Sequence, residues 1–217
     1  MKNKKQRTQI QLSLKEEVGN SVTHGVMALF LLLYLPFGSV YAYLQGGWLL
    51  CIGTSIFIIS LFFMFLMSTL YHAMAPDSKH KAVFQILDHI AIYFAIAGSY
   101  TPIALYLIRG WLGWLLITIQ WTMVLVGIIY KSISRKSIPK LSVLIYLTMG
   151  WIAVLFIPTL IQKADSTFLL LIGLGGILYS IGAYFYMQKH RPGFHFIWHL
   201  FINFAALSHF VAIAFYI

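Results

Sequence analysis

Long apolar stretches alternate with short polar breaks along the whole chain. Seven of these stretches are long enough to cross the apolar core of a bilayer as helices, which takes about 20 residues each. They cover residues 22–43, 48–72, 86–108, 111–130, 141–161, 167–187 and 194–217. The stretches are too long, and alternate too little, to be the strands of a membrane barrel. The pattern therefore predicts an all-α, polytopic membrane protein with seven transmembrane helices.

Glycine and proline add detail to this pattern. The breaks between stretches carry glycine, proline or charged residues, as in Gln45-Gly46-Gly47 and Arg109-Gly110. Prolines inside the stretches predict helix kinks, at Pro36, Pro102 and Pro158. Small residues on the sixth stretch predict close helix packing, at Gly173, Gly175, Gly176 and Gly182.

The composition supports a membrane protein. The 217 residues include 60% hydrophobic and 9% charged positions, against about 25% charged in an ordinary soluble domain. This balance excludes a disordered chain, a disulfide scaffold and an ordinary cytosolic enzyme. The single cysteine, Cys51, lies in an apolar stretch and indicates little about redox compartment.

The net charge is +10, and its interpretation depends on which side of the predicted helices the charged residues lie. Of the 15 Lys and Arg residues, 13 fall on one side of the predicted helices. They are Lys2, Lys4, Lys5, Arg7, Lys15, Lys79, Lys81, Lys131, Arg135, Lys136, Lys140, Lys189 and Arg191. Only Arg109 and Lys163 lie on the other side. The positive-inside rule then predicts a cytoplasmic N-terminus and an outside C-terminus, and the dispersed charge argues against a nucleic-acid partner.

The predicted domain organisation is simple. Residues 1–21 form a cytoplasmic or interfacial N-terminal segment, and residues 22–217 form a single seven-helix transmembrane domain. The basic start is followed by polar residues and no small-residue cleavage site, so it does not read as a cleavable signal. Apolar positions on one helical face allow residues 8–19 to lie in the interface, and an ordinary solvated tail is the alternative.

Ionisable residues inside the stretches are rare, and such residues are functional candidates. Asp88 is the only acidic residue within a predicted helix. It lies near the cytoplasmic end, at the same depth as five histidines: His24, His72, His89, His195 and His199. The sixth, His209, lies roughly 21 Å deeper than His195 at 1.5 Å per residue, and we assign it to helix packing.

The histidine spacing predicts a metal site. His195 and His199 are four residues apart and share a helix face, and His72 would add a third imidazole. Three neutral nitrogen ligands with an open fourth position are typical of catalytic Zn²⁺. Asp88 could then orient and deprotonate a water molecule. Ser68 precedes His72 by one turn; it has either a functional role or a bond to its own helix carbonyl.

Four motifs together resemble the hemolysin III family, which groups with the progestin and adiponectin Q receptors and, more distantly, the alkaline ceramidases. They are Glu17-x-x-Asn20-x-x-Thr23-His24-Gly25, Ser68-Thr69-Leu70-Tyr71-His72, Asp88-His89 leading to Ala97-Gly98-Ser99-Tyr100-Thr101-Pro102, and His195-x-x-x-His199. The resemblance runs from Glu16 to the C-terminus and implies the same zinc ligands, with the metal near the cytoplasmic face of a bacterial plasma membrane.

The resemblance also implies roles for residues around the ligands. Asp88 would hold a metal-bound water, and Ser68 would support the site or an oxyanion. Candidates for supporting the ligands from behind are Glu17, Asn20, His24 and His89. For His24 and His89 the simpler interpretation is an ordinary polar group at the membrane interface. The chain lacks the long N-terminal region of the eukaryotic receptors, so hormone binding is not implied.

Three functions follow from these predictions. The first is a zinc-dependent, ceramidase-like hydrolase of a lipid amide or ester near the inner leaflet, with membrane lipids as partners and a lipid substrate in the helix bundle. The second is a non-catalytic sensor or regulator of membrane-lipid homeostasis with a structural zinc. The third is a cytolytic pore, although no stretch shows the polar stripe of a water-filled channel.

Overall fold

The structure, a computed structural model, describes residues 12–133, 138–188 and 190–217, and over these ranges it is helical without strands. Among the described residues, six helices are long and apolar enough to cross a membrane. The predicted all-α membrane fold is thereby confirmed. The basic residues before position 12, and Arg135, Lys136 and Lys189, lie outside the described residues.

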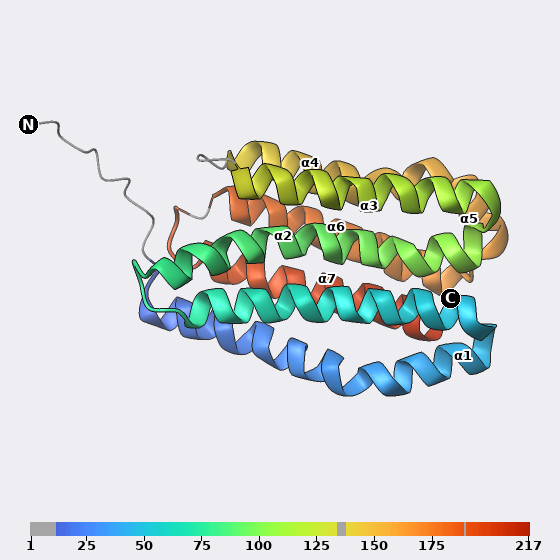
Figure 1. The fold of residues 1–217 in the computed structure, drawn as a ribbon, viewed down its shortest axis with the longest axis horizontal. Helices are drawn as coiled ribbons and strands as arrows, with labels where there is room; N and C mark the ends of the chain where they lie inside the picture. The colour runs from blue at the N-terminus through green and yellow to red at the C-terminus, as the bar shows by residue number, and fades with distance from the viewer. Residues whose placement is uncertain (1–11, 134–137, 189) are drawn as a thin grey trace, which may run out of the picture.

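The longest helix is α1, Leu14–Ala73, and it folds back on itself. Ser13 caps its N-terminus by accepting a hydrogen bond from the Glu16 backbone N–H, while the Glu16 side chain accepts one from the Ser13 N–H. At Gly47 the backbone adopts φ 71° and ψ −164°, a conformation open to glycine. The chain reverses there, so residues 14–46 and 47–73 form two arms that run in opposite directions (Figure 1).

The remaining helices follow the predicted stretches, except that the helix predicted to begin at residue 86 begins seven residues earlier, at Lys79. They are α2 (Lys79–Pro102), the π-helix η1 (Ile103–Ile108), α3 (Gly110–Ile133), α4 (Pro139–Trp151), the 3₁₀ helix η2 (Ile152–Phe156), α5 (Ile157–Lys163), α6 (Ser166–Met187) and α7 (Phe194–Phe215). Every predicted break is a helix end or, at Gly47, a reversal. The first helix begins at Leu14, ahead of the predicted start at residue 22, so positions 14–19 continue into α1 instead of forming a separate interfacial helix.

Two of the three prolines mark a change of helix type. Pro102 is the last residue of α2 before the π-helix η1, and its missing N–H leaves the Gly98 carbonyl in the preceding turn without its α-helical donor. Pro158 lies in the first turn of α5, directly after the 3₁₀ segment η2. Pro36 lies inside α1. The backbone around Pro36 stays helical, since the residue of α1 with non-helical backbone dihedrals is Gly47.

The second arm of α1 supplies the centre of the bundle. Phe57, Leu61 and Phe65 are almost completely buried, and they belong to one cluster with Ala95 of α2 and Phe210 of α7. Many large apolar side chains on the outer faces of the helices are exposed, among them Phe37, Trp111 and Leu155, as expected where a surface contacts lipid. The core thus holds α1, α2 and α7 together, and these elements carry the candidate site.

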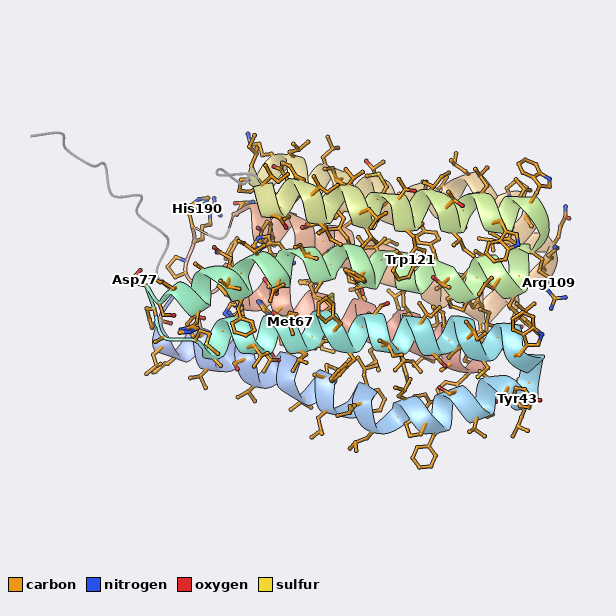
Figure 2. The ribbon with its side chains drawn as sticks, in the orientation of Figure 1. Tyr43, Met67, Asp77, Arg109, Trp121 and His190 are labelled. Atoms are coloured by element: carbon orange, nitrogen blue, oxygen red, sulfur yellow. The ribbon has the colours of Figure 1, made fainter. Side chains whose placement is uncertain are left out.

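The loops gather at two ends of the bundle. Figure 2 shows Asp77 and His190 at one end and Tyr43 and Arg109 at the opposite end. The described loops that were assigned to one membrane side therefore lie together. The histidine-rich helix termini, at the end of α1 and the start of α7, lie at the same end as Asp77 and His190.

Candidate metal centre

Three histidine side chains converge between α1 and α7. His72 lies in the last turn of α1, and His195 and His199 lie in the first two turns of α7. Nε2 of His195 is 3.5 Å from Nε2 of His72 and 3.3 Å from Nε2 of His199. All three ligand atoms lie within 4.8 Å of one another, and all three residues are buried. Of the predicted site residues, these three form the group that could hold a metal ion.

The spacing of the nitrogen atoms fits zinc. Ligands about 2.0–2.1 Å from a tetrahedral zinc ion lie about 3.3–3.4 Å from one another. Neutral imidazole lone pairs directed at one another at this distance repel, unless a proton or a cation lies between them. The donor set of three neutral nitrogens is one that zinc commonly takes, and it leaves a fourth tetrahedral position for a water molecule or a substrate.

Glu17 supports His72 from behind. Its Oε2 lies 2.6 Å from His72 Nδ1, and its Oε1 lies 3.0 Å from Lys81 Nζ. The Nδ1–H of His72 donates to the carboxylate, so the Nε2 lone pair is directed at the histidine cluster. Glu17 precedes the predicted first transmembrane stretch. It is nevertheless part of α1 and can contact His72, because α1 begins earlier than predicted. Next to it, Glu16 Oε1 accepts a hydrogen bond of 2.7 Å from the Gly193 N–H at the start of α7.

His24 supports His199 in a similar position. The two rings have their centroids 4.0 Å apart, and His24 Nε2 lies 2.9 Å from His199 Nδ1. The structure thus places His24 against a ligand candidate and not at an open interface. Asn20, one turn before His24, is completely buried, and its two side-chain amide atoms have no hydrogen-bond partner among the residues that the structure describes. Such an amide is unusual, because an unpaired buried polar group costs free energy.

Asp88 and Ser68 border a cavity together with His24. Ser68 is buried and its hydroxyl has no hydrogen-bond partner in the described part of the chain, so the predicted alternative of a bond to its own helix carbonyl is wrong. Asp88 is also buried, with a carboxylate oxygen 4.0 Å from His89 Nδ1. Both predicted catalytic residues therefore face space that a ligand can enter, and neither belongs to the converging nitrogen group.

His89 is not brought to the histidine cluster. Its Nδ1 lies 2.5 Å from the Gln85 carbonyl oxygen, and its Nε2 lies 3.2 Å from the Tyr186 hydroxyl on α6. Its own carbonyl accepts a hydrogen bond from Tyr146 on α4. These contacts join α2 to the neighbouring helices α4 and α6.

The cavity has a volume of about 460 Å³ and is lined almost entirely by apolar side chains. Along α2 and η1 its lining runs from Asp88 to Ile103, a helical rise of about 22 Å. The opposite walls come from the α4–α5 region, α6 and α7, including Tyr186 near one end and Leu160 near the other. The cavity is therefore long, narrow and apolar, with its carboxylate and free hydroxyl at one end.

The sequence contained one signal for the supporting contacts that the predictions did not use. Glu17, Asn20 and His24 are three and four residues apart, so a helix that starts before Glu17 places them on one face. On that face Glu17 contacts His72, and His24 contacts His199. The first contact depends on how the two arms of α1 pack together, and the second depends on how α1 packs against α7.

The chain is similar to a known family profile and to several named proteins. The family profile described as Haemolysin-III related matches residues 12–210. Hemolysin-3 of Bacillus cereus is 37% identical over 210 residues, which are 97% of this chain and 95% of the relative. The Hemolysin-3 homolog of Bacillus subtilis (strain 168) is 37% identical over 204 residues, covering 94% and 95% of the two chains. The human Monocyte to macrophage differentiation factor is 31% identical over 155 residues, 69% of this chain and 64% of the relative.

Proposed function

The chain belongs to the haemolysin-III related family of membrane proteins, and we propose that it is a zinc-dependent hydrolase of a lipid amide or ester. One observation carries the proposal. Three buried imidazole groups converge with their ligand atoms within 4.8 Å of one another, and a long apolar cavity has Asp88, Ser68 and the His199 partner His24 in its lining. A site for activating water and a site for holding an apolar chain are thus combined.

The protein's own residues divide the chemistry between them. When bound, zinc supplies a Lewis acid and lowers the pKa of a coordinated water molecule. Asp88 accepts the proton of the attacking water on a carboxylate oxygen and passes it to the leaving nitrogen or oxygen atom. The Ser68 hydroxyl, which has no partner within the protein, donates to the carbonyl oxygen as negative charge develops there. The apolar cavity walls hold the acyl chain and exclude bulk water.

We also propose that the bundle crosses the cell membrane seven times, with the N-terminus in the cytoplasm. The length of α1 supports this, since 60 helical residues would extend about 90 Å, three times the roughly 30 Å apolar core. The reversal at Gly47 divides α1 into two arms, each long enough for one crossing. The concentration of Lys and Arg on one side sets the orientation, and it places the metal centre near the inner leaflet.

Metal analysis of the purified protein tests the ligand set. We expect about one zinc ion per chain in the wild type and none in His195→Ala. His190→Ala is the matched control, because His190 is exposed in the loop before α7 and lies outside the histidine group. Stoichiometric zinc in both variants would show that His195 is not a ligand.

Turnover tests the chemistry separately from metal binding. On a panel of lipid amides and esters we expect Asp88→Asn to retain zinc and to lose about 10²–10⁴-fold in rate. A variant that hydrolyses the panel as fast as the wild type would exclude Asp88 as the proton carrier. Zinc binding with no turnover by the wild type, together with full physiological activity of Asp88→Asn, would instead favour a lipid sensor with structural zinc.

The name of the Bacillus cereus relative, Hemolysin-3, suggests a cytolytic pore as another candidate function. The bundle interior argues against it in the described part of the chain. The central side chains of α1 include Phe57, Leu61 and Phe65, which are almost completely buried in an apolar cluster. A water-filled channel needs a continuous polar lining along its axis.

A further inference from the structure

We propose that His209 binds a hydroxyl group in the middle of the substrate's acyl chain. The substrate class is then a lipid amide or ester with a hydroxylated acyl chain. The inference rests on the proposed function, because it takes the apolar cavity as the site of the acyl chain. It concerns a residue that the sequence assigned only to helix packing, far from the histidine cluster.

The His209 ring is held in one orientation between α6 and α7. Its Nε2 lies 3.1 Å from the Ile172 carbonyl oxygen, so Nε2 carries the proton and donates. The Tyr179 ring packs edge-on against it, with centroids 5.4 Å apart. Gly175 makes room for the imidazole, since a Cβ at that position would overlap the ring. The predicted close packing at Gly175 is confirmed, whereas Gly173 has open space around it.

The second ring nitrogen of His209, Nδ1, is buried and has no hydrogen-bond partner among the described residues. Because Nε2 holds the proton, Nδ1 presents a lone pair and can only accept a hydrogen bond. Leaving a hydrogen-bond acceptor unpaired in an apolar interior costs free energy. A hydrogen bond to Nδ1 therefore stabilises the complex more than the same hydrogen bond would at a position exposed to water.

The position of His209 specifies what kind of donor can reach it. His209 lines the same cavity as Ser68 and Asp88. It follows His199 by ten residues on α7, a rise of about 15 Å. A headgroup at the metal centre cannot span that distance, but the middle of an acyl chain that extends along the cavity can. The donor is therefore a group carried by the chain.

A hydroxyl on the chain matches the surroundings better than a trapped water molecule. A buried water needs two to four polar partners. Two hydroxyl groups along the cavity are already engaged, with Ser99 donating to the Ala95 carbonyl and Ser180 to the Gly176 carbonyl. A chain hydroxyl requires only one acceptor, because its carbon neighbours contact the apolar walls.

Equilibrium binding of two fatty acids to the purified full-length protein tests the inference. With the carboxylate at the metal centre, an extended 12-hydroxystearate chain carries its hydroxyl toward the depth of His209, and stearate lacks this hydroxyl. We expect the wild type to bind 12-hydroxystearate about fivefold more tightly than stearate, the effect of about one net hydrogen bond. His209→Leu, which keeps the apolar volume, should bind both equally. Equal binding by the wild type, or a preference retained in His209→Leu, would overturn the proposal.

Matched variants separate His209 from its surroundings. Tyr179→Phe keeps the ring that packs on the imidazole, and it should retain the preference for the hydroxylated chain. Gly175→Ala displaces the imidazole and should remove the preference, even if His209→Leu fails to fold. Loss of the preference in Tyr179→Phe with its retention in Gly175→Ala would assign the hydroxyl to Tyr179 and contradict the inference. Fatty-acid binding requires no turnover, so a protein that shows the preference but hydrolyses no lipid would contradict the proposed function alone.

Discussion

The Nδ1 atom of His72 lies 2.6 Å from a carboxylate oxygen of Glu17, although 55 positions separate the two residues in the chain. The contact joins the first turn of α1 to its last turn, across the reversal at Gly47. It sets which nitrogen of His72 is available to a metal, because the carboxylate accepts a hydrogen bond from the Nδ1–H and leaves the Nε2 lone pair free. Lys81 contacts the other oxygen of the same carboxylate, which holds Glu17 in place.

Replacing Glu17 by Gln should weaken metal binding without unfolding the protein. The amide keeps the size of the carboxylate but removes the charge that orients and polarises His72. Loss of such a supporting contact typically lowers metal affinity by about 10–100-fold. Competition for zinc with a chelator measures the affinity, and the visible spectrum of the cobalt-substituted protein reports the ligand geometry.

Glu16→Gln is the control for Glu17→Gln. Glu16 bonds to the Gly193 N–H and to Ser13 but touches none of the three histidines in the described contacts. We expect its metal affinity and cobalt spectrum to match the wild type. Equal metal affinity in Glu17→Gln and the wild type would refute the supporting role.

Ser68→Ala should reduce turnover while leaving stability unchanged or slightly raised. The Ser68 hydroxyl is buried without a partner, so its removal eliminates an unpaired polar group. If the hydroxyl stabilises a developing oxyanion, turnover falls by about 10²–10³-fold. Thermal unfolding and lipid hydrolysis are measured on the same preparation.

Ser99→Ala provides the comparison, because Ser99 also lines the cavity but bonds to the Ala95 carbonyl 2.6 Å away. Its turnover should stay near that of the wild type. A loss of stability in Ser68→Ala would mean that the hydroxyl has a structural partner, and unchanged turnover would exclude its role in the chemistry.

Gly47→Ala should destabilise the bundle through the backbone alone. Gly47 has φ 71° and ψ −164°, and a Cβ there would meet no neighbouring atom. The expected cost is about 1–3 kcal/mol, from forcing a side chain into a conformation that only glycine readily adopts. Thermal unfolding measures it. Gly150→Ala, also without a neighbour within 4 Å but with ordinary helical φ, should be neutral or stabilising. Similar unfolding temperatures for both variants would contradict a strained reversal.

Cysteine labelling tests the proposed orientation in intact cells. In a Cys51→Ser background, cysteines introduced at the exposed positions Gln162 and His190 lie in breaks assigned to opposite sides. A membrane-impermeant thiol reagent should label Gln162→Cys directly, and His190→Cys only after permeabilisation. The reverse result would invert the topology, and labelling of both from outside would contradict the seven-crossing arrangement.

The sequence predicted the helical architecture because a bilayer constrains composition locally. Each apolar segment must form its backbone hydrogen bonds internally and must contact lipid. Its length and ends can therefore be predicted from the segment alone, without knowledge of its neighbours. The same constraint made Asp88 and the histidines stand out. The predicted ligand group of His72, His195 and His199 is the group that converges in the structure.

Tertiary structure decided what each polar side chain touches. His89 and Asp88 are adjacent in the chain, yet His89 bonds to Tyr186 while Asp88 faces the cavity. The free hydroxyl of Ser68 and the free nitrogen of His209 were equally invisible in the sequence. Composition and periodicity establish which segments enter the membrane, because that depends on each segment and its solvent. Convergence of side chains depends on how the helices rotate and pack against one another, and this packing is a property of the whole bundle. The contact between His72 and His195, which are 123 positions apart in the chain, is an example.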